Sequence, residues 1–297
     1  MNNILFFGLP GNEKLAAQLA HKMDAQIGKA TFRRFPDGES YLRIHSDVTD
    51  KFMVLVCTLH QPDEKVLMLY FLSHTAKSLG AKSVCLVAPY LAYMRQDKVF
   101  KPGEGVTAQY FGKLISQFVD SIITIDPHLH RISSLSQVYQ IPNSVIHAGK
   151  EISEWIMENV RNPVLIGPDA ESKQWVLDVA KRANAPFIVL QKVRLGDNVV
   201  KVSIPEVVQY KKATPVLVDD IISTGHTMLE TIDHLKEEGM KPPICIGVHA
   251  VFAGNAYQEL LDARVERLVT CNTIPHPSNE IDLNEEMSEA IKKLICP

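Results

Sequence analysis

The stretch Val216-Leu217-Val218-Asp219-Asp220-Ile221-Ile222-Ser223-Thr224-Gly225-His226-Thr227 joins an apolar strand, two acids and a hydroxyl-rich turn that opens a helix. Backbone N–H groups at a helix N-terminus lack intrahelical partners and attract a phosphate dianion. Ligands of open α/β sheets bind at the carboxyl ends of the strands, where paired carboxylates can hold sugar hydroxyls. The residues that we assign to such a sugar-phosphate site are Asp219, Asp220, Ser223, Thr224, Gly225, His226 and Thr227.

Two residue types in this stretch also have ordinary structural uses. Ser and Thr cap many helices, and paired Asp residues often begin a turn. His226 can either donate a hydrogen bond to a phosphate oxygen or face solvent from the first turn of the helix. The combination of strand, acids and turn favours the sugar-phosphate interpretation over a plain helix cap.

The composition limits the classes of protein that fit. A length of 297 residues with 46% hydrophobic residues predicts two domains of roughly 150 residues each. The net charge is only -3 and the 31 Lys and Arg residues are scattered, which argues against a nucleic-acid partner. The five cysteines stand singly in apolar runs, as in reduced cytoplasmic proteins, and no apolar run is long enough for a membrane span.

Short apolar, β-branched runs alternate with longer amphipathic segments along the whole chain, which predicts an α/β fold with mainly parallel sheets. We place the domain boundary after residue 146, following a predicted turn at 139–144, and expect 283–297 to pack on the first domain. Strands are expected at 4–7, 53–57, 83–88, 121–125, 164–166, 187–190, 215–218, 244–250 and 267–271. Helical spacing predicts sheet-facing sides made of Leu67, Tyr70, Phe71 and Thr75, and of Leu229, Ile232, Leu235 and Lys236.

Several motifs resemble known families. The stretch 216–227 resembles the ribose-phosphate loop of the phosphoribosyltransferase fold. The segment Pro89-Tyr90-Leu91-Ala92-Tyr93-Met94-Arg95-Gln96-Asp97-Lys98 is similar to the ATP-site segment of ribose-phosphate diphosphokinases, the PRPP synthases. Other segments agree in order: Phe35-Pro36-Asp37-Gly38-Glu39, Asp126-Pro127-His128, Pro168-Asp169-Ala170, Lys192-Val193-Arg194 and Asn272-Thr273-Ile274-Pro275. The resemblance implies two tandem phosphoribosyltransferase-type domains, 1–146 and 147–297, each a mainly parallel sheet flanked by helices.

The resemblance also implies an ATP site. Phe35, Asp37 and Glu39 would contact the adenine of a neighbouring subunit's ATP, through an aromatic face and carboxylate acceptors. Arg95 and Gln96 would also bind ATP, with Arg95 offering a planar fork to phosphate oxygens. The shared use of one site by two subunits implies a homo-oligomer, either a dimer or a hexamer.

A magnesium site and a catalytic segment complete this interpretation. His128 and Asp169 would be Mg²⁺ ligands, with His130 a competing candidate, and nucleotide phosphates and water would fill the remaining positions. Lys192 and Arg194, in a flexible catalytic segment at 192–202, would neutralise the transferring phosphates, and Arg194 would also contact ribose 5-phosphate. The expected reaction moves the diphosphoryl group of Mg-ATP to the anomeric hydroxyl of ribose 5-phosphate, giving PRPP and AMP.

Some residues depart from the family pattern and keep alternatives open. Glu171-Ser172-Lys173 stands where common members have two glycines that cradle diphosphate, and His226 replaces a usual Gly. One alternative is a phosphoribosyltransferase that uses PRPP, which would leave Arg95, Gln96 and His128 unexplained. Another is a catalytically inactive regulatory subunit.

Overall fold

The computed structural model describes residues 3–129, 131–168, 172–190, 192–195, 198–201 and 207–295. The chain divides into two compact units. Unit 1 consists of Met1–Ile146 together with Asn284–Pro297, and unit 2 consists of His147–Leu283. Within the described residues, no helix has the length and apolar character needed to cross a membrane.

Unit 1 is built on a six-stranded sheet in the order β2-β1-β5-β6-β7-β8, in which every neighbouring pair is parallel. Its central strands are mainly apolar and almost wholly buried, as parallel sheets covered by helices require. The strands are β1 Ile4–Gly8, β2 Gln26–Ile27, β5 Phe52–Val56, β6 Ser83–Ala88, β7 Ser121–Ile125 and β8 Asn143–Ile146.

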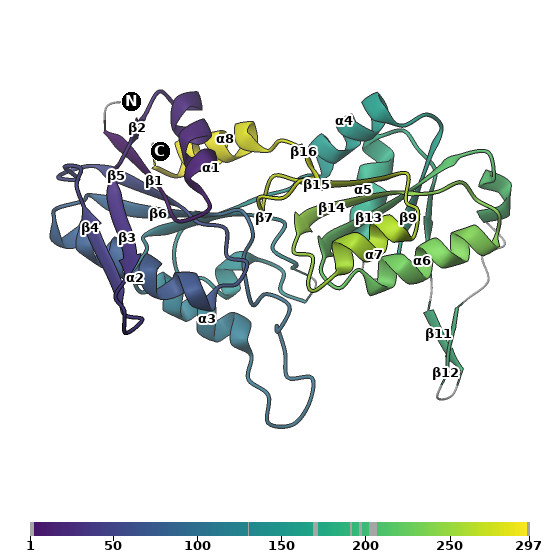
Figure 1. The fold of residues 1–297 in the computed structure, drawn as a ribbon, viewed down its shortest axis with the longest axis horizontal. Helices are drawn as coiled ribbons and strands as arrows, with labels where there is room; N and C mark the ends of the chain where they lie inside the picture. Colours follow the sequence, from purple (N-terminus) through teal and green to yellow (C-terminus); the bar gives the residue numbers. More distant parts are fainter. Residues whose placement is uncertain are drawn as a thin grey trace. The chain divides into compact units, whose positions relative to one another are not determined.

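Four helices cover this sheet, with α1 and α8 on one face and α2 and α3 on the other (Figure 1). Their bounds are α1 Glu13–Lys22, α2 Asp63–Ser78, α3 Thr107–Ser116 and α8 Asn284–Ile295. The last helix, α8, packs against α1, β7 and β8 and buries Met287 and Ile291. Lys22 and Glu285 form an ion pair between α1 and α8.

A separate antiparallel hairpin extends from unit 1. It pairs β3 Ala30–Arg34 with β4 Ser40–Ile44, and its turn is Phe35–Glu39. The inner side chains Phe32 and Leu42 pack on the main core. A short 3-10 turn at Leu135–Gln137 precedes β8.

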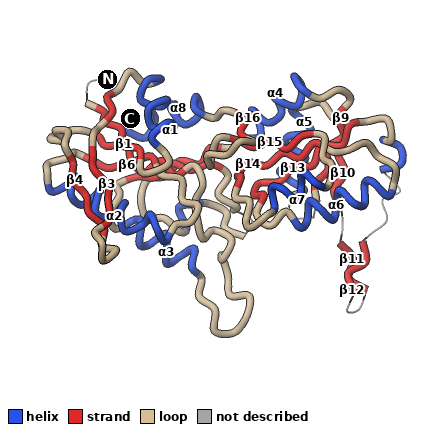
Figure 2. Tube along the Cα trace, viewed as in Figure 1, coloured by secondary structure: helices blue, strands red, loops and turns tan. Residues whose placement is uncertain are grey.

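Unit 2 repeats this arrangement with a six-stranded parallel sheet in the order β10-β9-β13-β14-β15-β16. Figure 2 shows its strands, in red, between helices on both faces. The strands are β9 Pro163–Gly167, β10 Phe187–Val189, β13 Thr214–Ile222, β14 Ile244–Ala250, β15 Arg267–Cys271 and β16 Asn279–Ile281. The helices are α4 Gly149–Asn159, α5 Lys173–Arg182, α6 His226–Glu237 and α7 Ala256–Asp262, with a 3-10 turn at Val207–Tyr210.

Because the two sheets have the same strand order, equivalent loops of the two units can be compared. The loop of unit 2 that we expect to bind the sugar phosphate follows β13, and its counterpart in unit 1 follows β5. In that counterpart loop the Lys65 ammonium lies 3.0 Å from Thr58 O, 2.6 Å from His60 O and 3.1 Å from His60 Nδ1. An internal cation therefore occupies the loop of unit 1, where unit 2 has an open, hydroxyl-rich turn.

The α/β architecture expected from the sequence is confirmed, and each of the nine expected strands is present. The hairpin β3–β4 and the strands β2 and β16 were not expected. The predicted turn at 139–144 is wrong at its end, because β8 begins at Asn143 and pairs with β7. The predicted face of α2 is also wrong: Leu67 is 52% exposed, while Leu69 and Leu72 are buried. This helix is apolar on nearly every side, so helical spacing did not identify the side that faces the sheet.

Candidate active site

The sugar-phosphate loop connects β13 to α6 in unit 2. Gly225 is the residue before the first turn of α6 and has the left-handed backbone angles φ 68° and ψ -2°. A Cβ at Gly225 would lie 3.3 Å from Leu260 Cδ1 and 3.7 Å from Ala256 Cβ, both on α7. The left-handed angle and the close packing of α7 both favour glycine at this position.

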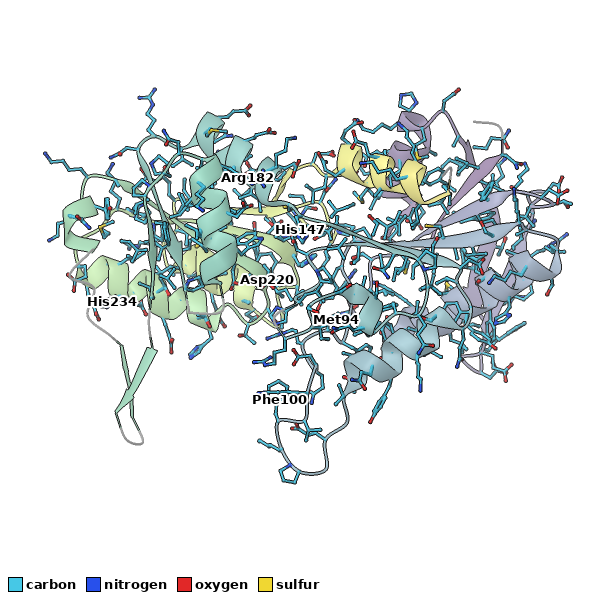
Figure 3. All side chains as sticks on the ribbon, turned by 180° about the vertical axis from the view of Figure 1, so that it is seen from behind. Met94, Phe100, His147, Arg182, Asp220 and His234 are labelled. Atoms are coloured by element: carbon cyan, nitrogen blue, oxygen red, sulfur yellow. The ribbon has the colours of Figure 1, made fainter. Side chains whose placement is uncertain are left out.

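The two acids of the loop lie in the last part of β13. We had expected Asp219 and Asp220 to follow the strand. The strand runs to Ile222, however, so both acids belong to it. Both are half-buried, and Asp219 Oδ1 accepts a hydrogen bond of 3.0 Å from the Asp220 N–H. Figure 3 labels Asp220 at the end of this strand.

The segment that follows β14 braces the start of the loop. The Phe252 N–H donates to Ile222 O at 2.9 Å, and the Ala253 N–H donates to Ser223 O at 3.0 Å. Phe252 has a φ of 38°, an uncommon value for an aromatic residue. The backbone of Ile222 and Ser223 is therefore fixed from a neighbouring strand before the hydroxyl-rich turn begins.

His226 extends into solvent along α6. Its side chain is 77% exposed, and Nε2 lies 3.2 Å from Glu230 Oε1 one helical turn later. Thr224 is also exposed, whereas Ser223 and Thr227 are half-buried beside the loop. Of the two interpretations of His226, this geometry agrees with the one in which the side chain faces solvent.

The residues expected to contact adenine form the tip of the β3–β4 hairpin. The Phe35 N–H donates to Glu39 O at 2.8 Å, and the Glu39 N–H donates to Asp37 Oδ1 at 3.1 Å. The Arg33 guanidinium lies 4.4 Å from the centroid of the Phe35 ring, which is 38% exposed. These contacts order the tip within the hairpin itself. Arg33 covers one face of the Phe35 ring, and Phe35, Asp37 and Glu39 are all exposed residues.

The second ATP segment occupies the loop between β6 and α3. Met94 is buried at its base, while Phe100 lies further out on the loop (Figure 3). Arg95 is exposed, and the neighbouring Gln96 Nε2 lies 3.4 Å from Glu104 Oε2. The same carboxylate oxygen of Glu104 accepts hydrogen bonds from the backbone of Phe100 at 2.8 Å and of Lys101 at 2.9 Å. These backbone hydrogen bonds lower the pKa of Glu104 below its ordinary value.

Tyr93 anchors the start of this segment. Its hydroxyl donates a hydrogen bond to the Asp63 carboxylate in the first turn of α2. That hydrogen bond raises the pKa of Tyr93 to about 12. The Tyr93 ring also packs on Phe111 with centroids 4.7 Å apart, and its φ of 64° is left-handed.

His128 lies in a tight turn after β7. Its N–H donates to Asp126 O at 2.8 Å, and both residues have positive φ values, 56° for His128 and 33° for Asp126. Non-glycine residues in such conformations are uncommon, and they cluster at functional sites. The imidazole is half-buried.

Several expected residues can be placed only by their backbone or not at all. Lys192 and Arg194 lie on β11 Lys192–Leu195, which pairs antiparallel with β12 Asn198–Lys201. The segment that we had expected to be flexible thus forms a hairpin over its described residues, and its flexibility stays a prediction. Asp169, His130 and Glu171 lie outside the described residues.

The sequence interpretation overlooked the side chains that support the ATP segment, namely Asp63, Glu104 and Arg131. Arg131 Nη1 lies 3.2 Å and 3.3 Å from the two carboxylate oxygens of Asp97. Only the proximity of Arg131 to His128 along the chain could have drawn attention to it.

Comparisons with known proteins extend over both units. Residues 4–118 match the N-terminal domain of ribose phosphate pyrophosphokinase, and residues 134–286 match a phosphoribosyl transferase domain. The ribose-phosphate pyrophosphokinase of Methanopyrus kandleri is 31% identical, covering 95% of this chain and 96% of that protein. That of Methanobrevibacter smithii is 30% identical, covering 97% and 100%.

A solved structure shares the same fold. The phosphoribosylpyrophosphate synthetase from Mycobacterium smegmatis superimposes with a TM-score of 0.85 at 23% identity, covering 98% of each chain. With two domain matches in order and relatives aligned over nearly their whole length, this chain belongs to the ribose-phosphate pyrophosphokinase family.

Proposed function

We propose that this protein is a ribose-phosphate diphosphokinase, which transfers the diphosphoryl group of ATP to the anomeric hydroxyl of ribose 5-phosphate and releases AMP and PRPP. The observation that carries this proposal is the near-complete alignment with relatives named ribose-phosphate pyrophosphokinase, at 31% identity over 95% of the chain. A sugar-phosphate loop and an ATP-type segment within the same chain agree with it. A phosphoribosyltransferase would use the first of these features and not the second.

The ribose 5-phosphate site is assigned to unit 2. The backbone N–H groups at the start of α6, with the hydroxyls of Ser223 and Thr227, bind the phosphate. Asp219 and Asp220 accept hydrogen bonds from the ribose hydroxyls. Asp219 and Ile221, on either side of Asp220, pair with Gly247 and His249 of β14, so the backbone of both acids is held in place before the substrate arrives.

ATP binding is assigned to side chains of unit 1 and to a neighbouring subunit. Arg95 and Gln96 contact the nucleotide from the loop between β6 and α3. Phe35, Asp37 and Glu39 contact the adenine of a neighbouring subunit's ATP. The half-exposed ring of Phe35 and the solvent-facing position of the hairpin tip support a contact made outside its own chain.

Residue chemistry supports a role for Mg²⁺. Mg²⁺ prefers oxygen ligands and with nucleotides uses one or two protein groups, several waters and phosphate oxygens. His128 and Asp169 are the assigned ligands, and bound Mg²⁺ supplies charge neutralisation on the phosphates.

The chain's own residues then align the two substrates and neutralise the charge on the phosphates. Lys192 and Arg194 neutralise the charge that develops on the leaving phosphate oxygens, while Asp219 and Asp220 hold the sugar so that its anomeric oxygen faces the β-phosphorus. The new bond joins that oxygen to the β-phosphorus, and the bond to the α-phosphate oxygen breaks. Positioning and electrostatics account for catalysis of this type without a covalent enzyme intermediate.

Homo-oligomer formation is part of the proposal. Exposed apolar side chains on α2 and α3, namely Leu67, Tyr70, Tyr110 and Leu114, provide surface for subunit contacts. Tyr70 packs edge-on against Phe118 at the end of α3, which connects the two helices. Large exposed apolar side chains that lie together favour an interface over free solvent.

The direct test is to incubate the purified protein with ribose 5-phosphate, Mg²⁺ and ATP and to measure AMP and PRPP together. We expect the two products in equal amounts, and their loss in Lys192→Ala. Binding of ATP and ribose 5-phosphate without either product would instead identify a regulatory subunit. ADP together with a phosphorylated sugar other than PRPP would rule out diphosphoryl transfer.

A further inference from the structure

One ion pair in unit 1 combines a buried acid with a partly exposed base. The Asp97 side chain is only 2% exposed, while that of Arg131 is 39% exposed. Arg131 Nη1 lies 3.2 Å and 3.3 Å from the two oxygens of the Asp97 carboxylate. Because the Asp97 side chain is buried, loss of Arg131 would leave its charge without this contact, so the pair constrains its surroundings more than a fully exposed pair does.

The pair joins two segments that leave adjacent strands. Asp97 directly follows Gln96 in the loop after β6, and Arg131 stands three residues after His128 in the segment after β7. The strands themselves are parallel neighbours, and the Ile125 N–H donates to Pro89 O at 3.3 Å where the two segments begin. Beyond that point Asp97 and Arg131 connect the segments through their side chains.

The same loop has two further tethers on either side of Arg95. The Tyr93 hydroxyl is bonded to Asp63, and Gln96 Nε2 lies 3.4 Å from Glu104. Arg131 also lies with its guanidinium 5.6 Å from the centroid of the Phe100 ring. Arg95 is thus an exposed residue on a backbone held by its neighbours, a common feature of residues that must meet a ligand in a set orientation.

We infer that Asp97 and Arg131 are positioning residues, which set the spacing between the ATP-binding residues Arg95 and Gln96 and the metal-ligand residue His128. The inference rests on the proposed use of Mg-ATP. Because the nucleotide phosphates and their metal must be held by both segments together, a change in this spacing lowers affinity for Mg-ATP and leaves the ribose 5-phosphate loop unaffected.

The experiment compares Asp97→Asn and Arg131→Lys with the wild-type chain. Asp97→Asn keeps the shape and removes the charge, and Arg131→Lys keeps the charge and removes the guanidinium whose Nη1 contacts both oxygens. We expect each to raise KM for ATP about tenfold or more, the effect of losing one charge-assisted hydrogen bond. The Mg²⁺ concentration for half-maximal rate should rise in parallel, while KM for ribose 5-phosphate stays within about twofold.

Lys77→Met is the matched control, because it removes an ion pair of 2.7 Å with Asp120 elsewhere in unit 1. It should leave both KM values unchanged. If Asp97→Asn and Arg131→Lys lower the unfolding temperature but change both KM values in the same proportion, the pair is merely structural and the inference is wrong.

ATP affinity should also be measured by calorimetry with and without Mg²⁺, because binding does not require turnover. A wild-type chain that binds ATP but forms no PRPP would refute the proposed function. The calorimetry would still test the positioning role in that case. It predicts weaker Mg-ATP binding in both variants, with a smaller loss for ATP alone, and equal losses under the two conditions would overturn it.

Discussion

The imidazole Nε2 of His226 lies 3.2 Å from Glu230 Oε1, one turn further along α6 and away from the turn that precedes the helix. The residue in the position most exposed to an incoming phosphate therefore interacts along its own helix. Exposed pairs of this kind contribute only about 0.3–0.5 kcal/mol to stability.

Replacing His226 with Ala should change KM for ribose 5-phosphate by less than about threefold, because only such a weak surface contact is lost. Thr227→Val is the comparison, since it removes a half-buried hydroxyl at the start of α6. We expect it to raise the same KM about tenfold, the effect of one hydrogen bond to a charged group. Steady-state kinetics with ribose 5-phosphate as the varied substrate distinguishes the two, and a larger effect at His226 would contradict the assignment.

Gly225→Ala should damage both the fold and the site. The left-handed φ of 68° is unfavourable for alanine by about 1–2 kcal/mol, and the new Cβ would meet Leu260 at 3.3 Å. Gly239→Ala is a matched control on the other end of α6, where φ is 70° and only Lys211 Nζ lies near, at 4.0 Å. Urea unfolding should show a loss of stability in both variants, whereas KM for ribose 5-phosphate should rise only in Gly225→Ala.

His60 should make the stability of unit 1 sensitive to acid. Burial, together with the nearby Lys65 ammonium, lowers the pKa of His60 from 6.5 to about 4. The unfolded chain takes up this proton below pH 6.5 and the folded chain only near pH 4, so the contribution to stability is complete above pH 6.5 and is lost as the pH falls to about 4. In this window His60 adds at most about 1.4 kcal/mol per pH unit to the slope of unfolding free energy against pH.

His60→Gln retains an acceptor for Lys65 and removes the titration. Urea unfolding of the wild type and the variant across this pH range should therefore give a shallower slope in the variant. Equal slopes would mean that the imidazole is not kept neutral by its surroundings.

Glu104→Ala should loosen the loop before α3. The carboxylate holds the backbone of Phe100 and Lys101 and contacts Gln96, so its removal frees all three. We expect trypsin to cleave after the exposed Lys98 several-fold faster, and KM for ATP to rise. Glu289→Ala on α8 removes only a surface pair with Lys293 and should leave the cleavage rate unchanged.

Nine strands of the two sheets were predictable from their mainly apolar, β-branched runs, whereas β2, β8 and β16 were not. The β3–β4 hairpin was not, since residues such as Thr31 and Arg33 give a polar, half-exposed pattern. The start of β8 was mistaken for a turn because Pro142, Asn143 and Ser144 are turn-forming residues. Pairing with β7 overrides that local preference.

A continuous stretch such as the loop from Asp219 to Thr227 can be recognised in the sequence, and its assignment to ribose 5-phosphate stays a prediction. The site was not predictable where residues distant in sequence meet. The contact between Asp97 and Arg131 spans 34 positions and depends on the alignment of β6 with β7. Spacing along the chain contains no signal for a contact of that kind.

The position of α8 affects the order in which the protein can fold. This helix buries Met287 and Ile291 in unit 1, yet its residues follow the whole of unit 2 in the chain. At ordinary rates of translation, the ribosome needs on the order of 10 s to synthesise the intervening residues. Throughout that interval α1, β7 and β8 lack their covering helix, so the unit that leaves the ribosome first is the last to complete its core.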